Sequence, residues 1–209
     1  MKNKLTLKNI IKKYKYREPG VIGKYKFFSV LVPFIEVKGE LNLLYEVRGR
    51  VVSQPGETCF PGGHVEAGES PKECAVRETE EETGIDRKHI HLIGPGDILP
   101  GYANYTLYTF LAIIDEEAIK TIRPQDGEVE EVFLMPVDKI MNTEPIVFRE
   151  LVRTEVNDDF PFETVGIDKN YDWRVGTWEI PIYEFDNRVI WGLTARITMH
   201  ILDQLNEEN

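Results

Sequence analysis

The chain has 209 residues, of which 42% are hydrophobic, and its formal net charge is −11 at pH 7. This length allows one full-sized domain with a sizeable core. The acidic balance disfavours general binding to nucleic-acid phosphates, and no apolar run reaches transmembrane length.

Residues 1–25 are predicted to form an N-terminal helical extension. Residues 1–13 are basic and amphipathic, and they lack the apolar stretch of a secretion signal. We therefore expect a short helix here and a cytoplasmic protein.

Apolar runs predict the strands of a sheet in residues 26–114. Residues 26–37 and 41–48 predict a hairpin that turns at Lys38-Gly39-Glu40, with Pro33 marking a sheet edge or a bulge. Residues 90–98 and 105–114 predict two more strands. The second of these is almost continuously apolar, which is typical of a central strand.

Between these strands, residues 63–85 contain a strong helix signal. Ser70 can be the N-cap, Pro71 suits the first helical position, and Glu73 completes a capping box. Gly84 suits the position after the last turn. The helix is therefore predicted over residues 71–83.

Three carboxylates share one face of this helix, because Glu78, Glu81 and Glu82 stand at i, i+3 and i+4. Such a cluster is tolerated if it is solvated or if a cation lies among the carboxylates. Magnesium takes oxygen ligands from a few carboxylates and substrate phosphates. The alternative is an ordinary acidic surface. Cys59 and Cys74 lie in the same region and are predicted to be buried small hydrophobes, not a disulfide.

Residues after the sheet predict further elements. Residues 131–135 predict a strand and residues 136–141 a short helix. Residues 155–187 are rich in aromatics and turn formers, and they predict a β excursion over the active site or against a partner; the alternative is that these aromatics belong to the core. Residues 191–205 predict an amphipathic helix with a stripe of Leu193, Ile197, Ile201 and Leu205.

The order of elements predicts an α/β sandwich with a mixed sheet over residues 26–209. No repeat, linker or second domain is expected. The four histidines show no metal-binding pattern.

The pattern G-x5-E-x7-R-E-x-x-E-E-x-G in residues 63–85 resembles the Nudix box of the Nudix hydrolases. The resemblance extends over about residues 26–141 and implies the Nudix αβα sandwich. It also implies hydrolysis of a nucleoside diphosphate linked to another group. One departure is Thr79, which stands where the family prefers a bulky aliphatic residue and is interpreted as a packing variation.

The resemblance assigns roles to residues of the box. Glu78, Glu81, Glu82 and the backbone carbonyl of Gly63 are expected to hold Mg²⁺ or Mn²⁺. Arg77 is expected to hold a catalytic glutamate in place through a charge-assisted hydrogen bond to Glu69 or Glu81; the alternative is an ordinary surface ion pair. A general base is expected from a helix glutamate or from the acidic segment 127–131, with Glu128 as the candidate, although that segment is also typical of a solvated turn.

Residues 43–63 resemble the segment that precedes the box in coenzyme A pyrophosphatases, L-L-T-x-R-(S/A)-x3-R-x3-G-x3-F-P-G-G. Arg48, Gly56 and the run from Phe60 to Gly63 match, and residues 191–196 resemble the start of the C-terminal helix of those enzymes. Three positions depart from the pattern: Glu46, Gly49 and Val52.

This second resemblance implies hydrolysis of coenzyme A or its derivatives to adenosine 3′,5′-bisphosphate and 4′-phosphopantetheine. Arg48, Arg50 and Phe60 are the candidate substrate-binding residues, and Arg50 could replace the arginine expected at Val52. For both arginines the alternative is a role in surface solubility.

The three departures leave two other functions open. One is a Nudix pyrophosphatase of ADP-ribose or another nucleoside diphosphate derivative, and the other is a non-catalytic nucleotide-sensing module. A small-molecule substrate is expected, without nucleic acid or membrane partners. A homodimer is compatible with the sequence.

Overall fold

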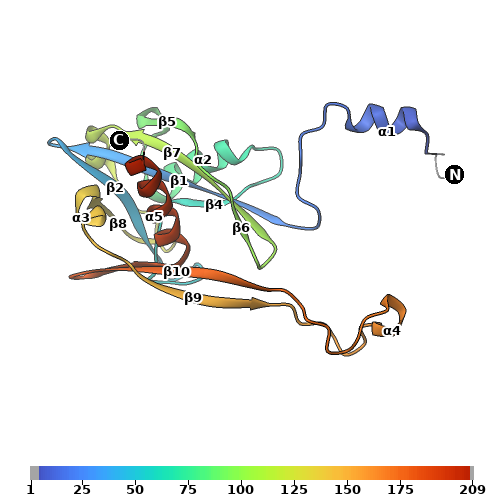
Figure 1. The fold of residues 1–209 in the computed structure, drawn as a ribbon. Helices are drawn as coiled ribbons and strands as arrows, with labels where there is room; N and C mark the ends of the chain where they lie inside the picture. The colour runs from blue at the N-terminus through green and yellow to red at the C-terminus, as the bar shows by residue number, and fades with distance from the viewer. Residues whose placement is uncertain (1–4, 208–209) are drawn as a thin grey trace.

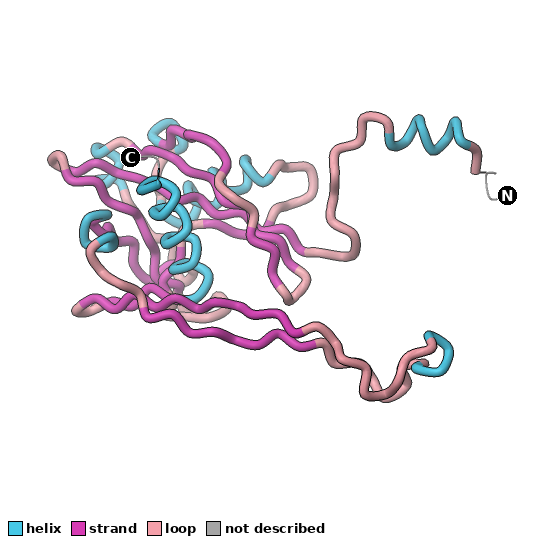
Figure 2. Tube along the Cα trace, in the orientation of Figure 1, coloured by secondary structure: helices cyan, strands magenta, loops and turns pink. Residues whose placement is uncertain are grey.

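The structure is a computed structural model that describes residues 5–207. It contains an eight-stranded sheet and a separate three-stranded sheet (Figures 1 and 2). The strands of the larger sheet are β1 (Lys26–Val37), β2 (Glu40–Arg48), β3 (Thr58–Cys59), β4 (Gly62–His64), β5 (Ile90–Pro95), β6 (Leu99–Gly101), β7 (Tyr105–Ile114) and β8 (Val129–Pro136). The smaller sheet contains β9 (Ile146–Arg153), β10 (Val175–Phe185) and β11 (Arg188–Trp191).

The α-helices are α1 (Leu7–Tyr14), α2 (Pro71–Thr83), α3 (Val137–Met141), α4 (Phe162–Val165) and α5 (Gly192–Glu207). Two 3₁₀ turns, η1 (Arg87–His89) and η2 (Glu116–Thr121), flank the strand pair β5 and β7. The predicted helix 71–83 is confirmed, and the predicted helix 136–141 begins one residue later.

The larger sheet is mixed, because β1 runs parallel to β7 and antiparallel to β2 and β4. Its main order is β3-β2-β1-β7-β5, with β8 paired to β2 and β6 to β7. The predicted hairpin 26–48 and the central place of residues 105–114 are both confirmed.

The two faces of the larger sheet are covered by different helices. Residues of β1 alternate between the faces, as a strand requires. Leu31 and Ile35 belong to the core that contains Ala75 of α2, while Val32 and Phe34 belong to the core that contains Ile197 of α5. This arrangement is the predicted αβα sandwich.

The prediction for Pro33 was wrong about the sheet edge. Pro33 lies in the central strand β1, opposite Ala112 of β7. On the other side of β1, pairing with β4 ends at Val30 and pairing with β2 begins at Phe34. Proline is therefore tolerated in this interior strand, because it lies where the neighbouring strand changes from β4 to β2.

The β excursion differs in its bounds from the prediction. It begins at Ile146 with β9, whose pattern was not recognised, and β9 and β10 form a long antiparallel hairpin. The β9–β10 hairpin (residues 146–185) packs beside α5 at its base, and its other end projects away from the sheets and carries α4 near the tip (Figure 1). Trp191, expected to begin the last helix, ends β11.

The predicted strand 90–98 is also divided, because β5 ends at Pro95 and β6 follows as a separate strand. In the N-terminal extension, α1 has no buried residue and lies apart from the sheet (Figure 1). Residues 1–4 of the predicted N-terminal helix lie outside the described residues. Within residues 5–207, no helix is long and apolar enough to cross a membrane.

Candidate active site

Local sequence signals position helix α2. The Ser70 hydroxyl accepts a hydrogen bond from the Glu73 backbone N–H, and the Glu73 carboxylate accepts one from the Ser70 N–H at 2.7 Å. Gly84 ends the helix in the left-handed conformation, with φ of 72°. These caps satisfy backbone groups at both ends of the helix and fix its first and last residues, and with them the positions of its glutamates.

Strand β4 lies directly against α2. A Cβ atom on Gly63 would be 2.3 Å from Oε1 of Glu78, and one on Gly62 would be 2.3 Å from the Ser29 carbonyl oxygen. At Gly62 only glycine allows the backbone to approach β1 so closely, whereas a side chain at Gly63 would displace the Glu78 carboxylate. The predicted role of the Gly63 carbonyl needs this proximity.

Arg77 connects three carboxylates. Its guanidinium lies 2.9 Å from oxygens of Glu69, Glu78 and Glu81. The hydrogen bonds from Arg77 and the Glu66 backbone lower the pKa of Glu69 to about 2. Both predicted partners of Arg77 are thus present together, and Arg77 orients the carboxylates.

Glu82 occupies a different environment from Glu81. Glu82 is buried and its Oε2 accepts a 2.7 Å hydrogen bond from the Gly62 N–H, whereas the Glu81 side chain is 52% exposed. The three helix carboxylates predicted to share one face therefore lie at three depths: Glu81 at the surface, Glu78 between, and Glu82 inside.

Glu46, which in the sequence is only a departure from a motif, lies close enough to Glu78 and Glu82 in the structure for their charges to interact. Glu46 is 1% exposed on β2, and its Oε1 accepts a hydrogen bond from the Cys59 thiol at 3.3 Å. Burial is the largest cause that raises the pKa of Glu46, and the charges of Glu78 and Glu128 raise it further. An available signal was a glutamate inside the apolar run of residues 43–47.

Glu128 is brought to the same cluster. It is half-buried just before β8, and its backbone carbonyl accepts a 2.7 Å hydrogen bond from the Gly49 N–H. A Cβ on Gly49 would be 2.2 Å from the Gly127 carbonyl oxygen, so the glycine that departs from the motif allows this loop to approach. The candidate base thus lies near Glu46.

The residues present suit a hard divalent cation. Glu46 and Glu82 are buried carboxylates, and electrostatic repulsion between them adds to the effect of burial in raising the pKa of Glu82 to about 9. Oxygen donors with excess negative charge are the ligands that Mg²⁺ and Mn²⁺ prefer. The helix carboxylates have different partners in this structure: Arg77 pairs with Glu78 and Glu81, whereas the Gly62 N–H binds Glu82.

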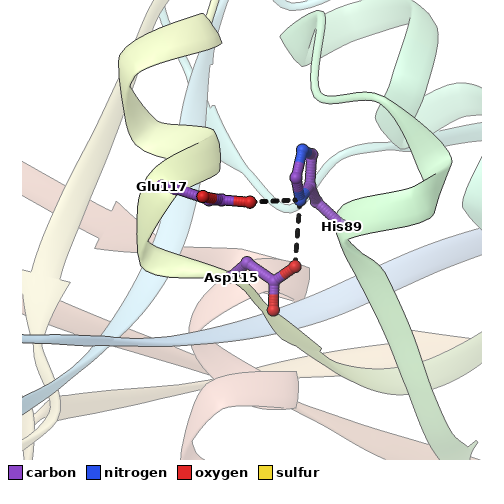
Figure 3. Close-up of side chains that lie close together, drawn as sticks. All are labelled: His89, Asp115 and Glu117. Atoms are coloured by element: carbon purple, nitrogen blue, oxygen red, sulfur yellow. Dashed lines mark hydrogen bonds and ion pairs between the residues drawn. The ribbon is translucent and has the colours of Figure 1, made fainter.

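A second acidic cluster lies elsewhere. Among residues 5–207, the one group of three metal-ligating side chains within 4.8 Å of one another is His89, Asp115 and Glu117. His89 Nδ1 lies 2.9 Å from Asp115 and 3.6 Å from Glu117 (Figure 3). The sequence did not reveal this group, because its members come from η1, the end of β7 and η2.

A cavity of about 620 Å³ lies beside Gly62, between the larger sheet and the β10–α5 region. Aromatic side chains form much of its lining: Phe28, Phe60, Tyr102, Tyr105, Trp178 and Trp191. Gly62 also lines the cavity, and its N–H binds Glu82. Gly62 is thus shared between the cavity wall and the carboxylate cluster, while Glu46, Glu78, Glu81 and Glu82 do not line the cavity themselves.

The candidate substrate residues have different positions. Arg48 lines the cavity, and its Nε donates to the Ser53 carbonyl at 2.7 Å. Arg50 is exposed and does not line it. Phe60 lines the cavity but is 2% exposed and stacks on Tyr45 with ring centroids 4.7 Å apart, so most of its surface belongs to the core.

The β9–β10 hairpin contributes Glu150, Trp178 and Ile180 to the lining of this cavity. Trp178 of β10 lines the cavity, meets Tyr102 edge-to-face at 5.5 Å, and lies under the Arg196 guanidinium at 4.0 Å. The sequence predicts an aromatic-rich segment over residues 155–187 but no function for Trp178.

In chelating buffer, the free energy of unfolding should fall as pH rises from about 5 to about 9. The pKa values of Glu46 and Glu82 are raised from 4.5 to about 7 and about 9. The folded protein therefore binds more protons in this window than the unfolded chain, so stability present at low pH is lost as pH rises through the folded pKa values. Urea unfolding at several pH values measures this, and a steady rise in stability over the window would contradict it.

Comparison with known proteins gives a family match and several relatives. A family model described as NUDIX domain matches residues 27–153, more than half of the chain. Nudix hydrolase 3 of Caenorhabditis elegans is 32% identical over 116 residues, which are 54% of this chain and 48% of that protein.

Two relatives from Mus musculus are named as coenzyme A diphosphatases. The peroxisomal coenzyme A diphosphatase NUDT7 is 31% identical over 137 residues, 64% of this chain and 56% of the relative. The mitochondrial coenzyme A diphosphatase NUDT8 is 29% identical over 173 residues, 81% of this chain and 73% of the relative. The chain spans about half the length of the first two relatives.

Proposed function

Since this chain belongs to the Nudix family, we propose that it is a metal-dependent pyrophosphohydrolase of coenzyme A or its derivatives. The products would be adenosine 3′,5′-bisphosphate and 4′-phosphopantetheine. The observation that carries this proposal is the aromatic cavity that has Arg48 in its wall and is also lined by Gly62, whose N–H binds the Glu82 carboxylate of α2. The segment 43–63 and the names of two relatives support the choice of substrate.

The proposed chemistry assigns one task to each group of residues. Glu78, Glu81, Glu82 and the Gly63 carbonyl would hold Mg²⁺ or Mn²⁺, which neutralises phosphoryl oxygens and lowers the pKa of the attacking water. Arg77 keeps Glu78 and Glu81 oriented.

Glu128 is our candidate for the base that accepts the water's proton. It lies close enough to Glu46 for its charge to raise the pKa of that carboxyl. A base must reach the water within hydrogen-bonding distance, and the loop that carries Glu128 is held against Gly49 near the cluster.

One observation favours the alternative substrate, ADP-ribose or another nucleoside diphosphate derivative. Glu57 and Glu150 line the cavity with Arg48, and their charges oppose an additional phosphate. The retention of Glu78, Glu81 and Glu82 disfavours the non-catalytic sensing module, since a binding module has no need of the metal carboxylates.

Coenzyme A should be cleaved with a higher kcat/KM than dephospho-coenzyme A by roughly ten- to a hundredfold, because an arginine fork on the 3′-phosphate contributes a few kcal/mol. Arg48→Ala should remove much of this difference. Arg50→Ala is the matched control, since Arg50 lies outside the cavity lining. Steady-state kinetics on both substrates and ADP-ribose provide the test. A preference for ADP-ribose, or for dephospho-coenzyme A, would overturn the substrate assignment and leave the hydrolase assignment standing.

We also infer a homodimer formed through the β9–β10 hairpin. β9 is the edge strand of its sheet, and Ile146, Phe148 and Leu151 are 51%, 57% and 60% exposed. An edge strand with exposed apolar side chains is suited to pairing with another chain.

Sedimentation equilibrium should therefore report a dimer, and the double substitution Phe148→Lys and Leu151→Lys should shift it to monomer. A monomer at every concentration of the unmodified protein would refute the inferred assembly. We expect the protein in the cytoplasm, whereas the two mouse relatives are named peroxisomal and mitochondrial.

A further inference from the structure

Glu46 has a carboxylate oxygen that is buried without a partner. Its side chain is 1% exposed, and within residues 5–207 its Oε2 is one of three buried side-chain polar atoms that lack a hydrogen bond. Native proteins leave few such atoms, and a buried charged oxygen is the costliest kind. Glu46 therefore needs an explanation that the packing of β2 does not supply.

The surroundings of Glu46 are rich in negative charge. Oε1 accepts a hydrogen bond from the Cys59 thiol, the residue opposite Glu46 in the pairing of β2 with β3. The negative charges of Glu78 and Glu128 raise the pKa of the Glu46 carboxyl, and the charge of Glu46 in turn raises the pKa of Glu82. Arg48 is the positive group among these neighbours, and its guanidinium is already bound to Ser53.

Two buried carboxylates on facing elements can be made stable in two ways. A proton can neutralise one of them, or a cation can lie between them. The Glu82 Oε2 atom is held by the Gly62 N–H, which fixes that side chain from the α2 side. From the β2 side, Glu46 Oε1 is bound by the Cys59 thiol of β3, and Cys59 lies three residues before Gly62, the residue that holds Glu82.

We propose that Glu46 is an additional ligand of the divalent cation, supplied by β2, and that its free Oε2 and the Glu82 carboxylate form an inner cation position. This inference rests on the proposed metal-dependent function and extends its ligand set beyond the box helix. A buried carboxylate pair provides oxygen donors and the negative charge that Mg²⁺ or Mn²⁺ requires. The motif position that departs from related sequences thereby acquires a role.

The full-length protein, stripped of metal with a chelator and dialysed, is titrated with MnCl₂ by calorimetry without substrate. The wild type is compared with Glu46→Gln, which keeps the shape of the side chain and removes its charge. Glu36→Gln is the matched control, because Glu36 is an exposed glutamate of the neighbouring strand β1. We expect Glu46→Gln to weaken Mn²⁺ binding at least about tenfold or to remove one binding event, and Glu36→Gln to leave it unchanged.

Thermal unfolding separates a ligand from a protonated structural residue. If Glu46 binds the cation, Mn²⁺ raises the Tm of the wild type more than that of Glu46→Gln, while the metal-free variant is at least as stable as the metal-free wild type. If Glu46 is only a neutral buried acid, glutamine replaces it without changing the Mn²⁺ affinity or the Mn²⁺-induced rise in Tm, and the proposal is overturned.

A second variant covers the case in which Glu46→Gln does not fold. Glu46→Asp keeps the charge but withdraws the carboxylate from the cluster, so Mn²⁺ affinity should again fall; unchanged affinity refutes the proposal. These binding results are independent of hydrolysis. Loss of the Glu46 effect with activity intact rejects only the extra ligand, whereas a wild type that binds Mn²⁺ but hydrolyses no nucleoside diphosphate compound rejects only the proposed function.

Discussion

Replacing Glu82 with glutamine should lower kcat by at least about a hundredfold while the fold remains intact, and Glu81→Gln should have a similar effect. Glu82 is the buried carboxylate of α2, so the uncharged amide removes a ligand oxygen where water cannot replace it easily. Initial rates with saturating Mg²⁺ and circular dichroism measure activity and folding separately.

The same helix offers a matched control for these variants. Glu80 directly precedes Glu81 in sequence, but its carboxylate pairs with Arg87 at the surface. Glu80→Gln should therefore retain nearly all activity. If the Glu81→Gln, Glu82→Gln double variant stays active in chelator-treated buffer, the metal-based account of catalysis is wrong.

Replacing Arg77 with alanine should lower kcat by roughly ten- to a hundredfold with little change in KM, because it displaces the carboxylates that Arg77 orients. Its guanidinium bonds Glu69 from two nitrogens and also reaches Glu78 and Glu81. The Glu69–Arg77 pair is partly exposed, so we expect a loss of alignment more than a loss of stability.

Arg77→Lys and Arg87→Ala complete this test. Lysine keeps the charge but cannot reproduce the guanidinium fork, so it should restore only part of kcat. Arg87 forms a comparable ion pair with Glu80 on the same helix, away from the cluster, and its loss should be nearly silent. A rise in KM with unchanged kcat in Arg77→Ala would assign Arg77 to substrate binding instead.

The parts of the site that follow from local sequence were predictable. Ser70, Pro71 and Glu73 form a capping box that depends only on neighbouring residues, so the limits of α2 and the spacing of its glutamates could be read directly. The approach of Gly63 to Glu78 followed from the resemblance to the Nudix box.

The parts that depend on tertiary pairing were not predictable. Glu46 looks like a motif departure in sequence, and its importance arises only because β2 places it near Glu82, 36 positions later in the numbering (82 − 46). β9 was missed because its side chains are exposed on both faces, so it lacks the alternation of a half-buried strand. The edge position predicted for Pro33 was wrong because the local sequence does not show that the strand paired with this side of β1 changes from β4 to β2.

The depth of the glutamates also required the structure. Helical spacing places Glu78, Glu81 and Glu82 on neighbouring positions, but it does not reveal that Glu82 is buried while Glu81 faces solvent. Likewise, the sequence offered Arg48 as a match to the motif and Arg50 as a replacement for a missing arginine, and the structure shows that Arg48 lines the cavity and Arg50 does not.

Product identification by mass spectrometry tests the central claim most directly. The purified protein is incubated with coenzyme A and Mg²⁺, and the Glu81→Gln, Glu82→Gln double variant serves as the blank. We predict adenosine 3′,5′-bisphosphate and 4′-phosphopantetheine in equal amounts from the wild type and neither from the blank. Intact coenzyme A under conditions in which ADP-ribose is cleaved, or equal product formation by the double variant, would contradict the account.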